Sequence, residues 1–243
     1  METILNPNWN RLAVLGFAIM ALASHMVAQA PVRSYSSLEL PKLELATQKV
    51  QMEELLSRAP ASLIEKNDGR DFIYKTVASG LPESYKARAG EIASTLITQA
   101  NKYHLDPVFL LAVIKTESRF NPLAHGRHGD IGLMQLLPKT GQWMASRMKI
   151  KGHIDLRDPI LNIKIGAAYF AYLRKHFGSK GSRYLAAYNM GIRNVHKLLK
   201  EDKEPLIYAT RVLKNYRDLY AKWSASVAPQ KQAELAPYRG DDT

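Results

Sequence analysis

The C-terminal two thirds of the chain alternates apolar and polar residues with the period of an α-helix. Between Leu81 and Tyr103, apolar side chains recur every three or four positions, which places them on one face of a helix that Pro82 opens. The spacing therefore predicts a helix with one side buried in a core. The residues of this face are Tyr85, Ala89, Ile92, Leu96, Ala100 and Tyr103.

Asp-Pro pairs at positions 106 and 158 predict the starts of two more helices. In each pair the aspartate can cap the helix, and proline is well tolerated in its first turn. The first helix spans 107–118 and is stopped by Asn121-Pro122, because the residue before proline avoids the helical region. The second ends at Gly178. Further helices are expected from Pro138 and over 182–189, 192–200 and 205–222.

Residues 124–137 interrupt the helical pattern with three glycines and allow at most a short β ribbon. We therefore expect a mostly α fold class, with a compact domain over 81–223. Residues 31–80 read as a spacer with a partial helix, and residues 224–243 as a flexible tail.

Residues 1–30 are expected to direct export. The uninterrupted apolar run over 12–23 follows Arg11, and its length suits the core of a signal peptide better than a spanning helix. Two small-x-small sites follow it. If neither is cleaved, residues 12–30 serve as a membrane anchor, so both outcomes predict a periplasmic or cell-envelope location. A buried core helix is disfavoured because the run has no polar face.

Charge and cysteine content narrow the classes of partner. The formal net charge is +12, which favours an anionic partner such as a wall polymer or a membrane surface. No run of six or more Lys and Arg occurs, so nucleic-acid binding is disfavoured. The chain has no cysteine, which excludes disulfides and thiolate metal sites.

Glu117 is the leading candidate for chemistry. It lies four residues after Val113 and three after Ile114, so it continues an apolar helix stripe that includes Leu110. Loss of hydration raises the pKa of a carboxyl, and a carboxylic acid that keeps its proton near neutral pH is a suitable general acid. Periodicity alone favours the other reading, in which Glu117 marks the point where the stripe ends in solvent; the neighbouring motifs favour the catalytic one.

Other residues around Glu117 have the chemistry of a sugar site. Gln135 and Asn189 can donate hydrogen bonds to sugar groups and accept them. Tyr188 and Tyr208 offer flat apolar faces with a polar tip. His125 and His128 with Asp130 form only a loose cluster, and we predict no metal there because zinc sites need more defined geometry.

Three ordered blocks resemble the lytic transglycosylases with a soluble-transglycosylase (SLT) domain, which belong to the lysozyme-like superfamily. The blocks are ESRFNPLA (117–124), GLMQLLP (132–138) and AYNMG (187–191), and a fourth, 158–173, resembles the family's connecting helix. The resemblance implies a lysozyme-like α+β catalytic domain with a helical majority. It implies no cofactor, and the glycan strands of peptidoglycan as the substrate.

The resemblance also implies a mechanism that needs one carboxylic acid. Glu117 would protonate the bridging oxygen between N-acetylmuramic acid and N-acetylglucosamine, then act as base while the C6 hydroxyl closes a 1,6-anhydro ring. The implied substrate-binding residues are Ser118, Gly132, Met134, Gln135, Tyr188, Asn189 and Tyr208.

The chain departs from the family pattern at three positions. Gly126 stands where serine is common, so another group must help to position the glutamate. Leu137 replaces a methionine. Asp130 replaces a small residue, and is either a solvent-facing loop residue or a second catalytic carboxylate.

Two other functions remain open from the sequence. With Asp130 as a second carboxylate, the same scaffold would be a hydrolase of the lysozyme type. Without catalysis, it would be a wall-binding module of a secretion or conjugation apparatus. Oligomeric state is not predicted.

Overall fold

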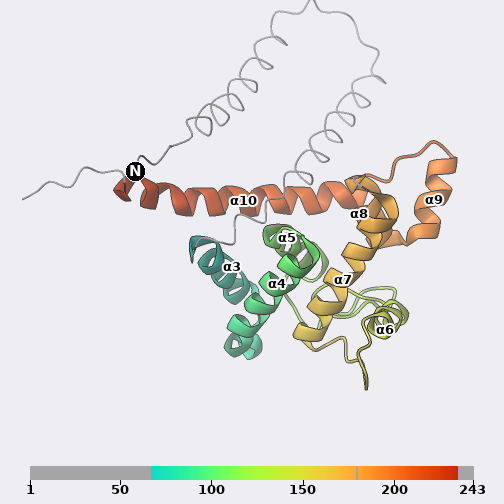
Figure 1. Cartoon of the computed structure of the whole chain (residues 1–243), viewed down its shortest axis with the longest axis horizontal. Coiled ribbons are helices and arrows are strands. Elements are labelled where there is room, and N and C mark those ends of the chain that lie inside the picture. Colours follow the sequence, from blue (N-terminus) through green and yellow to red (C-terminus); the bar gives the residue numbers. More distant parts are fainter. Residues whose placement is uncertain (1–66, 179, 235–243) are drawn as a thin grey trace, which may run out of the picture. The chain divides into compact units, whose positions relative to one another are not determined.

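The structure, a computed structural model, describes residues 67–178 and 180–234, with side chains for 69–178 and 180–226 (Figure 1). This part of the chain contains eight α-helices and one 3-10 helix. These residues belong to one compact unit. The elements are α3 (Asn67–Gly80), η2 (Glu83–Arg88), α4 (Ala89–Tyr103), α5 (Pro107–Glu117), α6 (Pro138–Arg147), α7 (Pro159–Phe177), α8 (Gly181–Met190), α9 (Ile192–Lys200) and α10 (Ile207–Glu234).

Both Asp-Pro pairs begin helices, as predicted. Asp106 caps α5 by accepting hydrogen bonds from the backbone N–H groups of Val108 (2.7 Å) and Phe109 (3.4 Å). Its other carboxylate oxygen accepts from the Tyr216 hydroxyl at 2.5 Å, which ties the start of α5 to α10. Asp158 caps α7 in the same way, and Gly178, at φ 64°, ends that helix.

Two helix boundaries differ from the prediction. The expected single helix after Pro82 begins as the 3-10 helix η2 and becomes α-helical only at Ala89. Helix α5 ends at Glu117, before the Asn121-Pro122 stop is reached, because the backbone at Arg119 and Phe120 turns to left-handed φ values of 52° and 66°.

Helix α5 lies at the centre of the core. It packs against α10, α4 and α3, and α4 also packs against α7. All eight residues from Pro107 to Ile114 are buried, so the helix is enclosed on every side rather than along the single stripe expected. The ring of Phe109 meets that of Phe170 edge-on at 5.5 Å, which links α5 to α7.

Helical packing extends beyond the limits suggested by the sequence. Helix α3 falls in the expected spacer, yet its Ile73 and Val77 are fully buried in the main core. Helix α10 continues past residue 223 to Glu234. The expected export signal or anchor, the rest of the spacer and the final nine residues lie outside the described residues.

The loop between α5 and α6 contains the β structure of the described region. It consists of two isolated antiparallel bridges, His125 with Ile131 and Ile131 with Leu136. The expectation of a helical majority with at most a short β ribbon is therefore confirmed. Among the described helices, none combines the length and apolar character that crossing a membrane requires.

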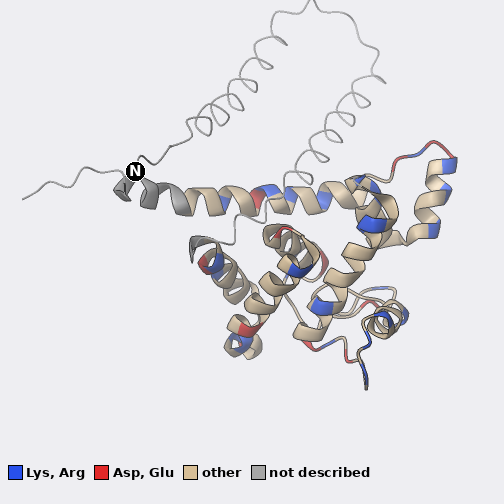
Figure 2. Ribbon diagram, viewed as in Figure 1, with Lys and Arg blue, Asp and Glu red and all other residues tan. Residues whose placement is uncertain are grey.

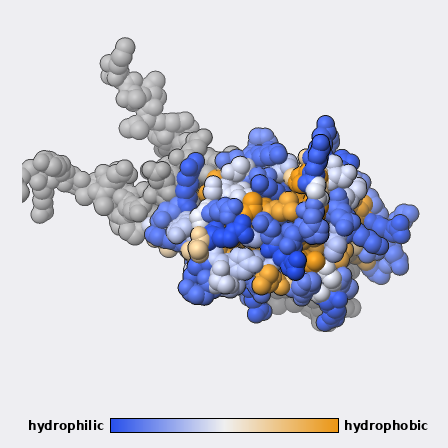
Figure 3. All heavy atoms as spheres, turned by 90° about the horizontal axis from the view of Figure 1, so that it is seen from below, coloured by the Kyte–Doolittle hydropathy of each residue, from blue (hydrophilic) through white to orange (hydrophobic). Residues whose placement is uncertain are grey.

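Charged residues lie on many of the described elements. Lys and Arg residues are distributed over most of the helices rather than gathered on one (Figure 2). On the face shown in Figure 3 the surface is mostly hydrophilic, and apolar residues gather in a few patches.

Candidate active site

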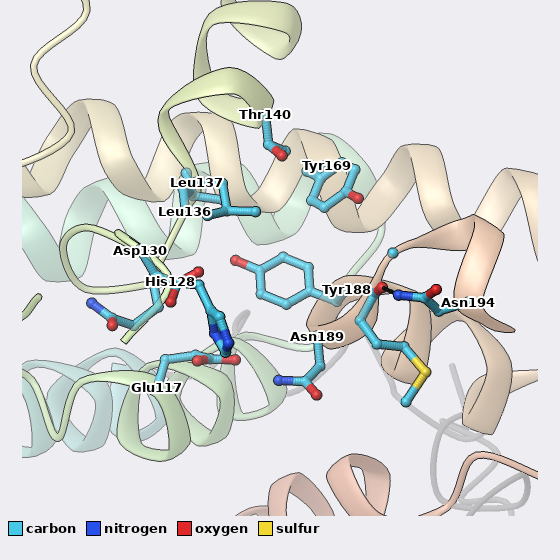
Figure 4. Close-up of a pocket in the computed structure, with 13 residues that line it drawn as sticks. Glu117, His128, Asp130, Leu136, Leu137, Thr140, Tyr169, Tyr188, Asn189 and Asn194 are labelled. Carbon is cyan, nitrogen blue, oxygen red and sulfur yellow. Dashed lines mark hydrogen bonds between the residues drawn. The ribbon is translucent and has the colours of Figure 1, made fainter. Parts of the chain in front are cut away.

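A cavity of about 490 Å³ opens at the C-terminal end of α5. The loop before α6 and helices α7 and α8 supply most of its walls, and Figure 4 shows Glu117 on the opposite side of the view from Thr140 and Tyr169. Its lining residues are Glu117, His128, Asp130, Gln135, Leu136, Leu137, Thr140, Tyr169, Tyr188, Asn189, Met190, Gly191 and Asn194.

Glu117 carries a partly buried carboxyl group that faces this cavity. Burial is the largest influence on it and raises its pKa from 4.5 to about 7. A hydrogen bond from the Tyr208 hydroxyl and the positive charge of Arg211 act against this rise, whereas the charge of Asp130 adds to it. At neutral pH a substantial fraction of Glu117 is therefore protonated.

Stacked aromatic rings hold Tyr208, the hydrogen-bond partner of Glu117, in place. Tyr208, on α10, is 3% exposed and donates its hydroxyl hydrogen bond to Oε1 of Glu117. Its ring lies 6.5 Å from that of Tyr188 at an interplanar angle of 20°, and Tyr188 stacks on Phe170 at 3.9 Å. The Tyr188 hydroxyl donates to the Met134 carbonyl at 2.7 Å. Both hydroxyls are thus fixed by packing and by a hydrogen bond.

One buried asparagine holds the loop that carries Gln135. Asn162, at the start of α7, is fully buried. Its Nδ2 donates to the carbonyls of Ile131 and Leu156, both at 2.9 Å, and its Oδ1 accepts from the Met134 N–H at 2.8 Å. Gly132 has a φ of 84°, and a Cβ there would lie 2.3 Å from the Asn162 amide nitrogen. Glycine is therefore required at 132 for both conformation and space.

Gln135 is held by its own loop. It adopts a left-handed φ of 45°, and its Nε2 donates to the carbonyls of Ala124 (3.0 Å) and Gly132 (2.9 Å). These two bonds offset the strain of the backbone and fix the side chain at the cavity wall. Its carbonyl oxygen Oε1 remains as the acceptor that can meet a ligand.

Gly126 and Asp130 fit together sterically. A Cβ at Gly126 would lie 2.3 Å from Oδ2 of Asp130, 2.9 Å from its Cβ and 2.7 Å from Oε1 of Gln135. The backbone of Gly126 is not in the left-handed region, so space rather than conformation accounts for the glycine. The Asp130 side chain takes that space and faces the cavity that Glu117 lines.

The structure brings together five of the eight residues predicted from sequence. Glu117, Gln135, Tyr188 and Asn189 line the cavity, and Tyr208 reaches it through its bond to Glu117. The other three do not line the cavity and pack against the residues that form its walls. Ser118 caps α5 and bonds to Ile114, Gly132 packs on Asn162, and Met134 is fully buried against Gly166.

Sequence reasoning gave no role to several residues that shape the site. Asn162 could have been noticed as a lone amide among the apolar residues that follow Asp158-Pro159. Thr140, Tyr169 and Asn194 carry no such signal, because only the packing of α6, α7 and α9 brings them to one cavity. Within the described residues, no group of three or more His, Asp or Glu side chains is arranged to hold a metal ion.

A protein-family model matches the part of the chain that contains the candidate site. Residues 94–210, which include Glu117 and every cavity-lining residue, match the family model described as Transglycosylase SLT domain. This match covers just under half of the chain. The matched segment begins within α4 and ends early in α10, so it contains both Glu117 and Tyr208.

Curated relatives match this chain over part of their own, longer sequences. The membrane-bound lytic murein transglycosylase C of Haemophilus influenzae, found in three strains, is 30% identical over 159 residues. The match covers 61% of this chain and 44% of the relative. The chain therefore spans less than half the length of these relatives.

Solved structures with partial similarity are also lytic transglycosylases. An inactive mutant of Slt from Pseudomonas aeruginosa is 28% identical, with a TM-score of 0.48, over 54% of this chain and 24% of that one. The 70 kDa soluble lytic transglycosylase from Escherichia coli is 25% identical, with a TM-score of 0.47 and the same two coverages.

Proposed function

We propose that this chain is a peptidoglycan lytic transglycosylase with Glu117 as its single catalytic acid and base. The observation that carries the proposal is a carboxyl group whose pKa is raised to about 7 and which faces an open cavity. A general acid works best when its pKa lies near the working pH. The SLT domain match and the names of the relatives support the same activity.

The proposed first step uses the free oxygen of Glu117. Tyr208 occupies Oε1, and no other described residue donates a hydrogen bond to this carboxyl, so Oε2 is the oxygen from which the proton leaves. Glu117 gives that proton to the glycosidic oxygen between N-acetylmuramic acid and N-acetylglucosamine. The C–O bond breaks, and the leaving sugar takes the bonding electron pair with the proton.

In the second step the ionised Glu117 acts as a base. It removes the proton of the C6 hydroxyl of the same muramic acid, whose oxygen then bonds to C1 and closes a 1,6-anhydro ring without water. The Tyr208 hydrogen bond and the positive charge of Arg211 both lower the pKa of Glu117, and so stabilise this ionised state. The proton acquired from C6 restores the starting acid.

The cavity supplies polar groups for the sugar substituents. Asn189 is exposed on the cavity wall, and its amide can both donate and accept. Gln135 presents its amide oxygen to the same space. Tyr188 adds an aromatic wall next to Glu117. We assign these three residues to binding of the amino sugars around the cleaved bond.

Product analysis tests the activity. Purified sacculi are digested with the wild-type chain and with Glu117→Gln, and soluble products are identified by mass spectrometry. We expect 1,6-anhydro-muropeptides from the wild type and none from the variant. Products with reducing ends alone would contradict the lytic mechanism, and undiminished activity of Glu117→Gln would contradict the assignment of the acid.

A hydrolase is the second candidate, because the Asp130 carboxylate lines the same cavity as Glu117. In that case Asp130 would activate water or act as a nucleophile, and the products would keep reducing ends. An Asp130→Ala variant that releases the same anhydro products as the wild type would exclude this function.

We also infer a location in the cell envelope. The apolar run over 12–23 supports it, as does the membrane-bound description of the Haemophilus influenzae relatives. Fractionation of cells that express the full chain would test this inference, with recovery in the cytosolic fraction alone as the contradicting result.

A further inference from the structure

An exposed tryptophan lies beside the cavity on a mostly polar helix. Trp143, on α6, is 40% exposed, although its helix also contains Lys139, Gln142 and Ser146. Keeping so large a ring in water forgoes the free energy that its burial would release.

Neighbouring side chains fix the orientation of this ring. Tyr172 meets it edge-on at 4.9 Å, and Tyr169 does so at 6.3 Å. Arg147, one turn further along α6, places its guanidinium 5.3 Å from the Trp143 ring and 5.4 Å from that of Tyr172. Trp143 is therefore exposed but ordered, which lowers the entropy cost of stacking a ligand on it.

The same ring is continuous with the Glu117 cavity. Tyr169 lines that cavity and also contacts Trp143, and its ring lies 5.5 Å from Tyr188 on the other side. Thr140, one helical turn before Trp143, lines the cavity as well (Figure 4). Neighbouring aromatic rings thus connect the cavity wall at Tyr188 through Tyr169 to Trp143.

The chemistry of this surface suits a sugar ring. A pyranose has an apolar C–H face that stacks on an aromatic ring, and polar substituents around its edge. The Arg147 guanidinium has five N–H donors, which can reach the hydroxyl and acetamide oxygens of a stacked sugar. A glycan strand that passes Glu117 has further sugars to place on either side of the cleaved bond.

We propose that Trp143, Tyr172 and Arg147 form an accessory subsite that binds one further N-acetylated sugar of the strand held in the Glu117 cavity. This inference rests on the proposed function, and it names residues that favour longer substrates. It predicts that affinity increases with glycan length, and that Trp143 supplies much of the increase.

The test measures how affinity depends on length. Full chain carrying Glu117→Gln, which cannot cleave its ligand, is titrated calorimetrically with a trimer and with a hexamer of N-acetylglucosamine. Adding Trp143→Ala should reduce the ratio of hexamer to trimer affinity by about fivefold to tenfold, the scale expected for one lost stacking contact. Arg147→Gln, which leaves the ring in place, should reduce the ratio by about twofold to threefold.

A matched control separates this subsite from general effects of aromatic removal. Tyr74 is also exposed, at 47%, and lies on α3 away from the cavity lining, so Tyr74→Ala should leave the ratio unchanged. An unchanged ratio in both Trp143→Ala and Arg147→Gln would overturn the subsite, while anhydro products from sacculi would still support the proposed function. Failure of Glu117→Gln to bind either oligomer would count against the proposed function itself.

Discussion

The carboxylate of Asp130 occupies the space that a side chain at residue 126 would need. A Cβ at Gly126 would lie 2.3 Å from Oδ2 of Asp130 and 2.9 Å from its Cβ, so rotating the carboxylate alone does not make enough room. The two positions are therefore coupled. A serine at 126 and an aspartate at 130 are alternatives, and this chain uses the aspartate.

The coupling predicts non-additive effects on stability. Gly126→Ser should lower the free energy of unfolding by about 1–2 kcal/mol, because the new side chain forces Asp130 and Gln135 aside. Combining it with Asp130→Gly, which removes the Cβ as well as the carboxylate, should recover much of that loss, which gives a coupling energy of about 1 kcal/mol in a double-mutant cycle. Urea unfolding of the four proteins measures it. Simple addition of the two single effects would show that the positions are independent.

Neutralising Asp130 should move the pH dependence of activity to lower pH. Its negative charge raises the pKa of Glu117, so Asp130→Asn lowers that pKa, and the catalytic acid loses its proton at a lower pH. The alkaline limb of kcat/KM against pH, which we expect near 7 in the wild type, then shifts downward. An unmoved limb would mean that the two carboxyls do not interact. Loss of activity at every pH would instead favour the hydrolase.

Removing the Tyr208 hydroxyl should move the same limb in the opposite direction. Its hydrogen bond stabilises the ionised form of Glu117 and lowers the pKa, so Tyr208→Phe raises the pKa and extends activity to higher pH. At the same time kcat should fall by about tenfold or more, because the base of the second step loses stabilisation worth about 1.5–3 kcal/mol. Kinetics over a range of pH separate the two effects. A limb shifted to lower pH in this variant would refute the assigned role.

Glu117 should also make stability depend on pH. Its folded-state pKa of about 7 lies above the ordinary value of 4.5, so the folded state holds this proton more tightly than the unfolded state. Its contribution to stability is full below pH 4.5 and is lost as pH rises to about 7. Across that window the wild type should lose up to about 3 kcal/mol relative to Glu117→Gln, measured by chemical unfolding. Parallel pH profiles of the two proteins would contradict this.

Local sequence rules predicted the helices of the fold well. Asp106 and Asp158 cap the helices they were expected to cap, since a cap depends on two or three neighbouring residues. The left-handed turn at Arg119 and Phe120 was missed, because neither residue favours that conformation and the turn is set by its packing. The burial of α3 was missed for a similar reason, as its partners lie elsewhere in the chain.

The candidate site was predictable only in part. Glu117 was identifiable because an acid continuing an apolar helix face is unusual. The family resemblance added Gln135, Tyr188, Asn189 and Tyr208. The direct bond between Tyr208 and Glu117 joins residues 91 positions apart, and no local pattern reports such a contact. Trp143 was passed over, since a single aromatic in a polar helix gives no sign of what it faces.

The three hydrogen bonds of Asn162 divide the loop before α6 into a fixed base and a tip whose sequence is free to change. They attach the backbone at Ile131 and Met134 to α7 from the inside, whereas Arg127 and His128 at the tip of the same loop are exposed. Substitutions of Arg127 or His128 can therefore change which ligands bind at the cavity entrance without displacing the part of the loop that carries Gln135. Evolution or design can therefore change ligand selectivity at this loop tip while Glu117 and its hydrogen-bond partner keep their positions.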